Sequence, residues 1–385
     1  MTALDESEGR GHLMIVIHSL RGGGAERVAV DLAGYWLDHG CRVSVVTQTS
    51  GEHDAYRLPD GVQRHALALD SDSGGGLRAV WANVRRGWAL RRIMRREQPA
   101  VVLGMMTKAS ILAVIAGRGL PCRVIATEHT HPPAQHLPAA WQRMRRWAYP
   151  RADAVVALTR GTADWLDAQI PGVRAQVIPN AVRWPLPEGE PALDAGVPEG
   201  RRRLLAVGRL HPIKGFDLLV RAFVSIADLF PDWDLVILGE GDQRPALQLQ
   251  IDEAGLGARI SMPGRAGNIA DWYGQADLYV LSSRSEGLSN TLLEAMAGGL
   301  PCLAFDCDTG PREIIRDGID GVLVRPAGDH EALAAWLSNL MAHPELRERV
   351  ARRAADVLDR FSVPRVMRMW QQVFSDSVRG RSARH

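Results

Sequence analysis

Residues 278–294 read L-Y-V-L-S-S-R-S-E-G-L-S-N-T-L-L-E, and this pattern indicates the architecture of the chain. The apolar run at 278–282 predicts a buried strand, and the stretch that ends at Glu294 has the apolar spacing of a helix. Glu286 then lies on the loop at the carboxyl end of a strand, the edge at which open α/β sheets bind ligands. Glu294 follows a little over two helical turns later, so both carboxylates can face one site and accept bonds from sugar hydroxyls. A surface helix with two solvated acids is the alternative.

A second strand-to-helix turn, residues 204–217, carries two cations. Gly208 ends the predicted strand at a point where backbone can approach a ligand, and Arg209 and Lys214 follow it. Only two of the 46 basic side chains are lysines, Lys108 and Lys214. A helix start attracts anions through its free N–H groups, and the added guanidinium and ammonium groups predict a diphosphate pocket. A loop with two solvated cations stays open as the alternative.

Length and composition bound the class of protein. The 385 residues suffice for two domains, and a hydrophobic content of 46% is that of an ordered globular chain. The four cysteines form no C-x-x-C pair and have no histidines at zinc spacing, which favours a reducing cytosol. We expect no export signal and no membrane span, because the apolar runs are too short. Residues up to 190 carry a net charge of +5 and the remainder −3, so the amino-terminal half is expected to meet an anionic surface.

The first residues predict a βαβ unit. Residues 13–18 form an apolar strand run, a glycine-rich turn that contains Gly23 and Gly24 follows, and residues 26–37 have helical spacing. Dinucleotide binding is the rival interpretation of such a turn. It is disfavoured because the turn reads G-G-G-A-E-R rather than G-x-G-x-x-G, and no acid follows the second strand at 43–46.

Alternation of strands and helices continues along the chain, with further strands predicted at 101–105, 123–127 and 154–158 and then near 204–208, 234–238, 258–262, 277–281, 301–305 and 321–324. A proline-rich stretch at 183–203 predicts a linker, after which the alternation restarts. The fold class is therefore α/β, with two doubly wound domains facing each other across a cleft. We expect an amino-terminal domain at 1–185, a second domain at 186–362, and a last helix at 363–385 that returns to the first domain.

Five spaced motifs resemble those of the retaining glycosyltransferases of family four, which have the GT-B fold, over roughly residues 13–375. They are G-G-A-E-R-V at 23–28, E-H at 128–129, G-R-L-x-x-x-K-G at 208–215, G-E-G-D at 239–242 and E-x7-E at 286–294.

The resemblance implies transfer of a sugar from a nucleotide donor, with retained configuration and without a metal. Arg209 and Lys214 would bind the donor diphosphate, Glu294 the ribose, and Glu286 the donor sugar; His129 would touch the transferring sugar. The remaining donor-binding positions are Gly23, Gly24, Gly208, Gly287, Leu288 and Ser289.

No cofactor is expected, because the nucleotide sugar, expected to be UDP-linked, is a substrate. Three D-x-D triplets, at 70–72, 232–234 and 306–308, spell the metal signature of the other glycosyltransferase fold. We discount them, because such triplets arise by chance in a chain of this length and the tandem βαβ layout argues against that fold.

Residues 77–97 predict a helix for the acceptor side. Leu77, Trp81, Val84 and Trp88 fall on one stripe, and arginines line its flank, as in a helix that lies in an anionic lipid interface. A core-packing stripe with solvated arginines is the alternative. The expected acceptor or membrane contacts are Arg78, Arg85, Arg92 and Lys108.

The expected acceptor is a saccharide linked to polyprenyl diphosphate, at the inner face of the cytoplasmic membrane. The chain is similar to bacterial α-1,4-N-acetylgalactosaminyltransferases that extend undecaprenyl-diphosphate-linked glycans, although its donor-sugar loop at 286–290 and Lys108 differ. A nucleic-acid partner is disfavoured, since no such module is visible. GDP-mannose as donor, a soluble acceptor, or a non-catalytic subunit of the same fold remain alternatives.

Overall fold

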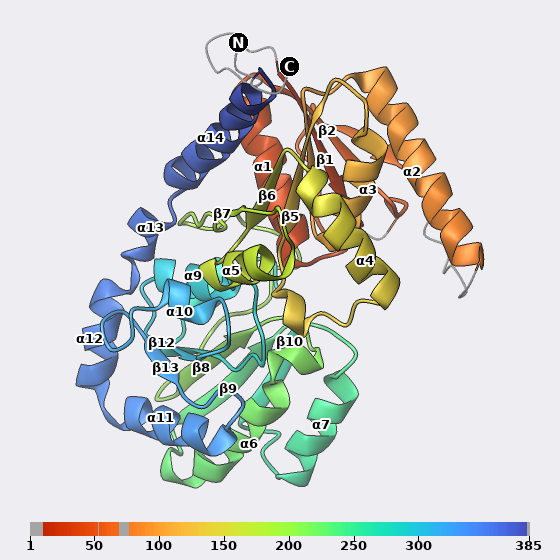
Figure 1. Ribbon diagram of the computed structural model, residues 1–385. Coiled ribbons are helices and arrows are strands. Elements are labelled where there is room, and N and C mark those ends of the chain that lie inside the picture. Colours follow the sequence, from red (N-terminus) through yellow and green to blue (C-terminus); the bar gives the residue numbers. More distant parts are fainter. Residues whose placement is uncertain (1–10, 53, 69–76, 383–385) are drawn as a thin grey trace. The chain divides into compact units, whose positions relative to one another are not determined.

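The computed structural model describes residues 11–52, 54–68 and 77–382. The chain divides into two compact units. Unit 1 comprises residues 1–179 and 366–385, and unit 2 comprises residues 180–365. Each unit is a parallel sheet with helices, as Figure 1 shows.

Unit 1 contains a seven-stranded parallel sheet in the order β3-β2-β1-β4-β5-β6-β7. The strands are β1 (His12–Ile17), β2 (Arg42–Thr47), β3 (Gln63–Ala66), β4 (Val101–Gly104), β5 (Arg123–Glu128), β6 (Ala154–Ala157) and β7 (Ala175–Val177). The helices are α1 (Gly24–Asp38), α2 (Leu77–Glu97), α3 (Thr107–Gly117), η1 (Pro132–Ala134), α4 (Ala139–Ala148), η2 (Tyr149–Arg151), α5 (Arg160–Gln169) and α14 (Val363–Ser382).

The sequence explains this sheet. Every residue of β1 is buried, as expected for a central strand covered on both faces. The strand order reverses at β1, whose neighbours are β2 and β4. The carboxyl end of β1 leads through the glycine turn into α1, so that turn lies at the position where doubly wound sheets bind ligands.

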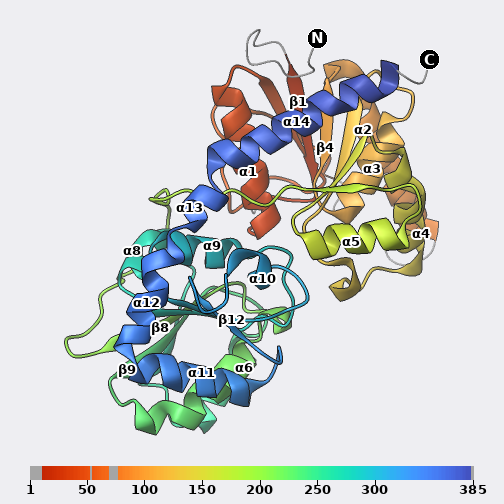
Figure 2. The ribbon, with the colours of Figure 1, turned by 60° about the vertical axis from the view of Figure 1, so that its left-hand side comes forward.

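The last helix, α14, packs on unit 1 (Figure 2). The Phe374 ring lies 5.3 Å from the ring of Trp36 in α1 and 5.7 Å from that of Trp370, measured between centroids. The Arg123 guanidinium donates to the Phe374 carbonyl. Residues far apart in the sequence thus belong to one core.

Unit 2 contains a six-stranded parallel sheet in the order β10-β9-β8-β11-β12-β13. The strands are β8 (Arg202–Val207), β9 (Trp233–Leu238), β10 (Ile260–Gly264), β11 (Leu278–Leu281), β12 (Cys302–Phe305) and β13 (Val322–Val324). The helical segments are η3 (Pro212–Lys214), α6 (Phe216–Ile226), η4 (Ala227–Leu229), α7 (Arg244–Glu253), α8 (Ile269–Gly274), α9 (Asn290–Ala297), α10 (Pro311–Ile314), α11 (His330–Ala342), α12 (Pro344–Ala354) and α13 (Val357–Arg360).

The predicted α/β class is confirmed: each unit is a Rossmann-like parallel sheet. All six strands predicted for unit 2 are present, because each is an apolar run between turn residues. Two short edge strands of unit 1, β3 and β7, were not predicted. β3 is mostly polar, β7 has only three residues, and both are at most half-buried, so they lack the apolar run that marks a central strand.

Candidate functional site

Two loops of unit 2 meet at the carboxyl edge of its sheet. The loop after β8 carries Lys214 and the loop after β11 carries Glu286, and these two strands are neighbours at the point where the strand order reverses. Gly215 lets the loops touch: its φ is +64°, and a Cβ there would lie 2.1 Å from the Ser282 carbonyl oxygen. Ser282 Oγ also donates to the Lys214 carbonyl over 2.9 Å. Any larger side chain at residue 215 would force the two loops apart.

Lys214 and Glu286 form an ion pair. Lys214 Nζ lies 2.6 Å from Glu286 Oε1, and Ser283 Oγ donates to the same oxygen over 2.6 Å. Glu286 is 8% exposed, so the pair is partly shielded from water. Thr309 Oγ1 holds the Glu286 backbone by donating to its carbonyl over 2.5 Å. Among the described residues no donor reaches Glu286 Oε2, so one carboxylate oxygen is left for another ligand.

Arg209 follows Gly208 on the loop after β8, and its side chain is exposed. The loop is fixed from behind by the G-E-G-D segment at 239–242: a Cβ on Gly239 would lie 1.9 Å from the Gly208 carbonyl oxygen. Leu210 N donates to the Glu240 carbonyl over 2.9 Å. Within the part of the chain that the structure covers, no hydrogen bond or ion pair occupies the Arg209 guanidinium. This cation sits on a rigid loop and is available to an anion.

Glu294 lies on α9, and it is buried at 4% exposure. Tyr273 donates to its Oε2 over 3.2 Å. Ser289 caps α9 by accepting from Leu292 N, and it follows Gly287 and the buried Leu288. The predicted set Glu286, Gly287, Leu288, Ser289 and Glu294 therefore forms one continuous loop-and-helix element, as the sequence indicated.

Sequence reasoning missed several side chains that build this edge. Ser283 and Thr309 hold Glu286, and Asn180 Nδ2 donates to Asn290 Oδ1 over 2.7 Å at the start of α9. Burial, and then the Glu286 charge, raise the pKa of Cys307 to about 12, so this thiol stays neutral at pH 7. The sequence feature that could have identified these residues is their place in the chain, because each follows a strand or precedes α9.

The glycine turn of unit 1 begins α1. Gly23 is its N-cap, in extended conformation and without a side-chain cap. A Cβ there would lie 2.4 Å from Glu26 Oε2. Gly24 is exposed at the first position of the helix. The Glu26 carboxylate therefore lies at the start of the helix, a position that favours an anion.

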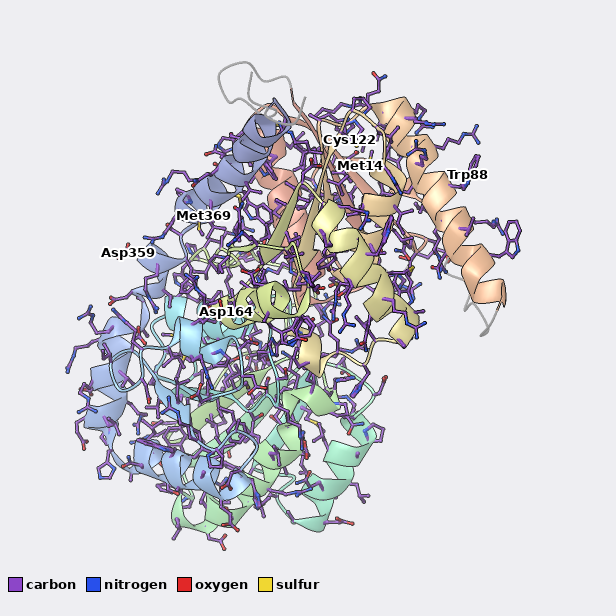
Figure 3. The ribbon with its side chains drawn as sticks, in the orientation of Figure 1. Met14, Trp88, Cys122, Asp164, Asp359 and Met369 are labelled. Atoms are coloured by element: carbon purple, nitrogen blue, oxygen red, sulfur yellow. The ribbon has the colours of Figure 1, made fainter. Side chains whose placement is uncertain are left out.

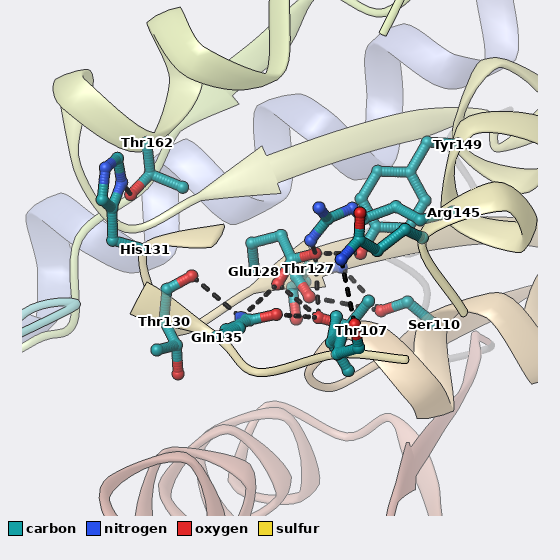
Figure 4. A network of polar contacts seen from close by, with 12 residues as sticks. Thr107, Ser110, Thr127, Glu128, Thr130, His131, Gln135, Arg145, Tyr149 and Thr162 are labelled. Atoms are coloured by element: carbon teal, nitrogen blue, oxygen red, sulfur yellow. Dashed lines mark hydrogen bonds and ion pairs between the residues drawn. The ribbon is translucent and has the colours of Figure 1, made fainter. Parts of the chain in front are cut away.

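Glu128, at the end of β5, is the centre of a buried polar network (Figure 4). Its carboxylate accepts from the Tyr149 hydroxyl over 2.5 Å, from Thr107 Oγ1 over 2.8 Å and from Gln135 Nε2 over 3.3 Å. Burial raises the pKa of Glu128, against the opposing influence of these donors and of Arg145. Half of the E-H motif is therefore structural.

His129 is half-buried beside this network. Its Nε2 lies 3.0 Å from Thr127 Oγ1. Its Nδ1 is buried and finds no hydrogen-bond partner among the residues that the structure describes. Burial lowers the pKa of His129 to about 4, so the ring is neutral at pH 7. The ring is therefore neutral, and its unused nitrogen is covered by protein.

Helix α2 exposes the stripe that the sequence singled out. The exposed fractions of Trp81, Val84 and Trp88 are 69%, 47% and 76%, and Figure 3 shows Trp88 pointing away from the rest of unit 1. The core contacts come from the opposite face, where Leu90 and Met94 are buried. The core-packing alternative is therefore wrong for these three side chains.

The structure describes the side chains of three of the four other predicted acceptor residues. Arg85 and Arg92 are exposed on α2, whereas the side chain of Arg78, like that of Leu77, lies outside the described residues. Lys108 Nζ lies over the ring of Trp141, 5.7 Å from its centroid. None of the helices that the structure describes is long and apolar enough to cross a bilayer.

Three of the four D-x-D acids that the structure describes, Asp232, Asp234 and Asp306, take part in ion pairs, whereas Asp308 forms none with the described residues. Asp234 pairs with Arg201 and Arg259, and Asp306 with Arg312 and Arg325. Asp232 lies 3.6 Å from Arg202. Asp70 and Asp72 lie outside the described residues.

Known proteins resemble both halves of the chain. Residues 22–183 match the model of Glycosyltransferase Family 4, and residues 194–357 match that of Glycosyl transferases group 1. A phosphatidyl-myo-inositol mannosyltransferase of Mycobacterium leprae is 32% identical over 91% of this chain and 93% of its own length.

More distant relatives include the Campylobacter jejuni α-1,4-N-acetyl-D-galactosaminyltransferase that acts on a diNAcBac-PP-undecaprenol glycan. It is 25% identical over 94% of this chain and 98% of its own length. Exopolysaccharide phosphotransferase SCO2592 of Streptomyces coelicolor is 32% identical over 82% of this chain, but the match spans only 32% of that protein.

A solved structure supports the fold assignment. Anabaena Alr3699/HepE in complex with UDP superimposes with a TM-score of 0.74 at 18% identity, covering 95% of this chain and 100% of that one. With two parallel-sheet units, these family matches and the mannosyltransferase relative, the chain belongs to the family-four, group 1 glycosyltransferases of the GT-B fold, and it is a glycosyltransferase.

Proposed function

We propose that the protein transfers a hexose or an N-acetylhexosamine from a UDP-sugar to a saccharide linked to polyprenyl diphosphate. The observation that carries this proposal is the Lys214–Glu286 pair at the edge of unit 2, in which Lys214 shares its loop with the exposed Arg209. Guanidinium and ammonium groups suit phosphate oxygens, and a carboxylate suits sugar hydroxyls. One edge of a sheet therefore offers matching groups to both parts of a nucleotide sugar.

The cations supply the electrostatic part of catalysis. When the bond between sugar and diphosphate breaks, negative charge grows on the leaving phosphate oxygen, so fixed cations stabilise the transition state more than the ground state. One of the three N–H groups of Lys214 donates to Glu286, which leaves two for phosphate oxygens. In this proposal Arg209 and Lys214 do the work of a metal ion.

Glu286 orients the donor rather than attacking it. Its Oε1 is held by Lys214 and Ser283, so Oε2 is the oxygen left to accept from a sugar hydroxyl. Glu294 would accept from the ribose, with Tyr273 holding its other side. The turn at Gly23 and Gly24 would present the start of α1 to the diphosphate.

We propose transfer with retained configuration on the family resemblance. The acceptor oxygen bonds to the anomeric carbon on the face from which the diphosphate departs, and the acceptor proton passes to the leaving phosphate oxygen. The products are the glycoside and the nucleoside diphosphate. His129, neutral at pH 7, would contact a hydroxyl of the transferring sugar.

The nucleotide and the acceptor rest on different observations. UDP is favoured because HepE, which shares the fold, was solved with UDP. The lipid-linked acceptor is favoured by the undecaprenol-linked relative and by the exposed Trp81, Val84 and Trp88 of α2. Tryptophans edged by arginines suit an anionic membrane surface, which would place the enzyme at the inner face of the cytoplasmic membrane.

A panel of radiolabelled nucleotide sugars with membrane lipid extract tests the proposal. We expect transfer from a UDP-sugar in the presence of EDTA, and loss of product when lipid is removed. Transfer from GDP-mannose alone would favour the alternative that the mannosyltransferase relative suggests. Binding of UDP without transfer or hydrolysis of any sugar nucleotide would contradict the proposed activity and favour a non-catalytic subunit.

A further inference from the structure

A pocket in unit 1 is unexplained by the donor site. It is bounded by the segment after β5, by α4 and by α5, and its volume is about 170 Å³. We call it the Arg145 pocket, after the side chain that distinguishes it. We propose that this pocket binds an acidic saccharide through its oxyanion, either a carboxylate or a phosphate ester. That this saccharide is the acceptor of the transfer reaction rests on the proposed function, whereas its binding to the Arg145 pocket does not.

Arg145 is buried without adequate compensation. It is 5% exposed, and its Nε and Nη1 make no hydrogen bond to any residue that the structure describes. Its one ion pair joins Nη1 to Glu128 Oε1 at 3.6 Å, longer than the 2.7–2.9 Å of a charge-assisted hydrogen bond. Burying a charge is costly unless it is paired and hydrogen-bonded. This guanidinium therefore lacks a close anion.

Glu128 does not satisfy Arg145, because Glu128 is already occupied. Its two oxygens accept from Tyr149, Thr107 and Gln135 at 2.5–3.3 Å (Figure 4). Burial also raises the pKa of this carboxyl, which weakens it as a counter-ion. A full negative charge in the pocket, contacted through Nη2, would give Arg145 a closer counter-ion than Glu128.

The position of the guanidinium is fixed. Its Cζ lies 5.0 Å from the centroid of the Trp165 ring, so the indole holds one face of the cation. Nε and Nη1 are covered by protein, which leaves Nη2 as the nitrogen that a ligand would meet first. Arg146 is exposed at the pocket and adds a second cation, and Gln142 adds an amide.

The rest of the lining fits a sugar rather than a bare ion. Pro132, Leu137 and Trp165 contribute apolar surface that a pyranose ring can cover. A cavity of roughly 150 Å³ holds one benzene ring, so about 170 Å³ has room for the charged group of an acidic sugar and part of its ring, with the remaining hydroxyl groups outside the pocket. Polar groups at one end and apolar walls at the other match an acidic monosaccharide unit.

Helix α4 offers a matched pair of variants for the test. Arg146 lines the pocket and Arg143 does not, although both are exposed arginines on the same helix. The full chain, without nucleotide sugar, is titrated with glucuronate, glucose 1-phosphate and glucose, followed by ligand-observed NMR. We expect at least one of the two anionic ligands to bind about tenfold or more tighter than glucose, since one lost charge-assisted contact is worth about that factor.

Arg146→Glu should weaken the anionic ligand by about tenfold or more, and Arg143→Glu should leave it within about twofold. Arg145→Gln should abolish binding; if that variant does not fold, the Arg143 and Arg146 variants still decide the question. Binding of glucuronate or of glucose 1-phosphate identifies the carboxylate or the phosphate as the source of the charge. The inference is overturned if glucose binds as tightly as both anions, or if the two charge reversals act equally.

The two proposals fail in different experiments. Arg146-dependent binding of an anionic sugar together with no transfer from any nucleotide sugar would refute the proposed activity and leave the pocket intact. Normal transfer with no anion binding would do the reverse.

Discussion

Glu286 and Glu128 both stand just where a strand of a parallel sheet ends, yet their surroundings differ. Glu286 pairs with a lysine and a serine through one oxygen and keeps the other without a donor from the described chain. Glu128 has donors on both oxygens and is 1% exposed. A carboxylate at the ligand-binding edge of a sheet is therefore not enough to mark a site. The comparison separates the carboxylate that we propose to bind the donor from one whose two oxygens already have donors within the fold.

The largest effect should come from the lysine of the open site. Lys214→Ala should lower kcat/KM by about 100-fold, or nearly 3 kcal/mol, because a charge-assisted contact to the leaving diphosphate is lost. Steady-state kinetics with the preferred donor measures it. Arg221→Ala, an exposed arginine on α6 of the same unit, is the control and should stay near wild type. Near-normal turnover in Lys214→Ala would end the site assignment.

Removal of the charge should lower the stability of the fold at Glu128 and the turnover at Glu286. Glu128→Gln should destabilise the fold by about 1–3 kcal/mol, because an amide N–H₂ replaces one acceptor for Thr107 or Tyr149. Glu286→Gln should reduce turnover and leave the unfolding midpoint nearly unchanged. Thermal unfolding and kinetics on both variants check this. If Glu286→Gln unfolds as readily as Glu128→Gln, the contrast between the two carboxylates is wrong.

The buried histidine next to Glu128 should make the stability of unit 1 depend on pH. The pKa of His129 is about 4 in the fold and about 6.5 when unfolded, so between these values the unfolded chain binds more protons. Stability should rise with pH through this window and be lost as pH falls from about 6.5 to 4, by up to about 3 kcal/mol.

Denaturant unfolding at several pH values compares the wild type with His129→Gln. The difference between the two curves isolates the histidine, because Glu128, whose raised pKa acts in the other direction, is present in both. Parallel curves would show that His129 titrates normally.

The smallest effect is expected for α2, whose proposed contact with the membrane rests on exposed rather than buried side chains. Arg92→Gln should weaken binding to anionic liposomes by about 1 kcal/mol, roughly fivefold, and the loss should shrink at high salt. Trp88→Ser should weaken it at all salt concentrations. Trp336→Ser, on exposed α11 of unit 2, serves as the matched control. If all three variants sediment with liposomes as the wild type does, the proposal that α2 binds the membrane is wrong.

Much of the architecture followed from pattern alone. Apolar runs such as β1 and β11 mark central strands. The spacing of Glu286 and Glu294 predicted one loop-and-helix element. These features depend on residues that lie close together in the chain, so they can be predicted from the sequence.

The remainder depends on contacts between distant segments. Nothing in the sequence shows that Lys214 reaches Glu286, because the pairing arises from the adjacency of β8 and β11. The same holds for Arg145, which reads as a surface arginine in R-M-R-R-W until the fold buries it against Trp165. In α2 the stripe was predicted, but only the exposed fractions of Trp81 and Trp88 show that these side chains lie outside the core.

Calorimetric titration of UDP into the protein in the presence of EDTA tests the central claim, that the loop after β8 grips the nucleotide diphosphate. The account predicts that wild type and Arg221→Ala bind UDP alike, and that Arg209→Ala and Lys214→Ala each bind it at least about tenfold more weakly. Equal UDP affinity in all four proteins would contradict it.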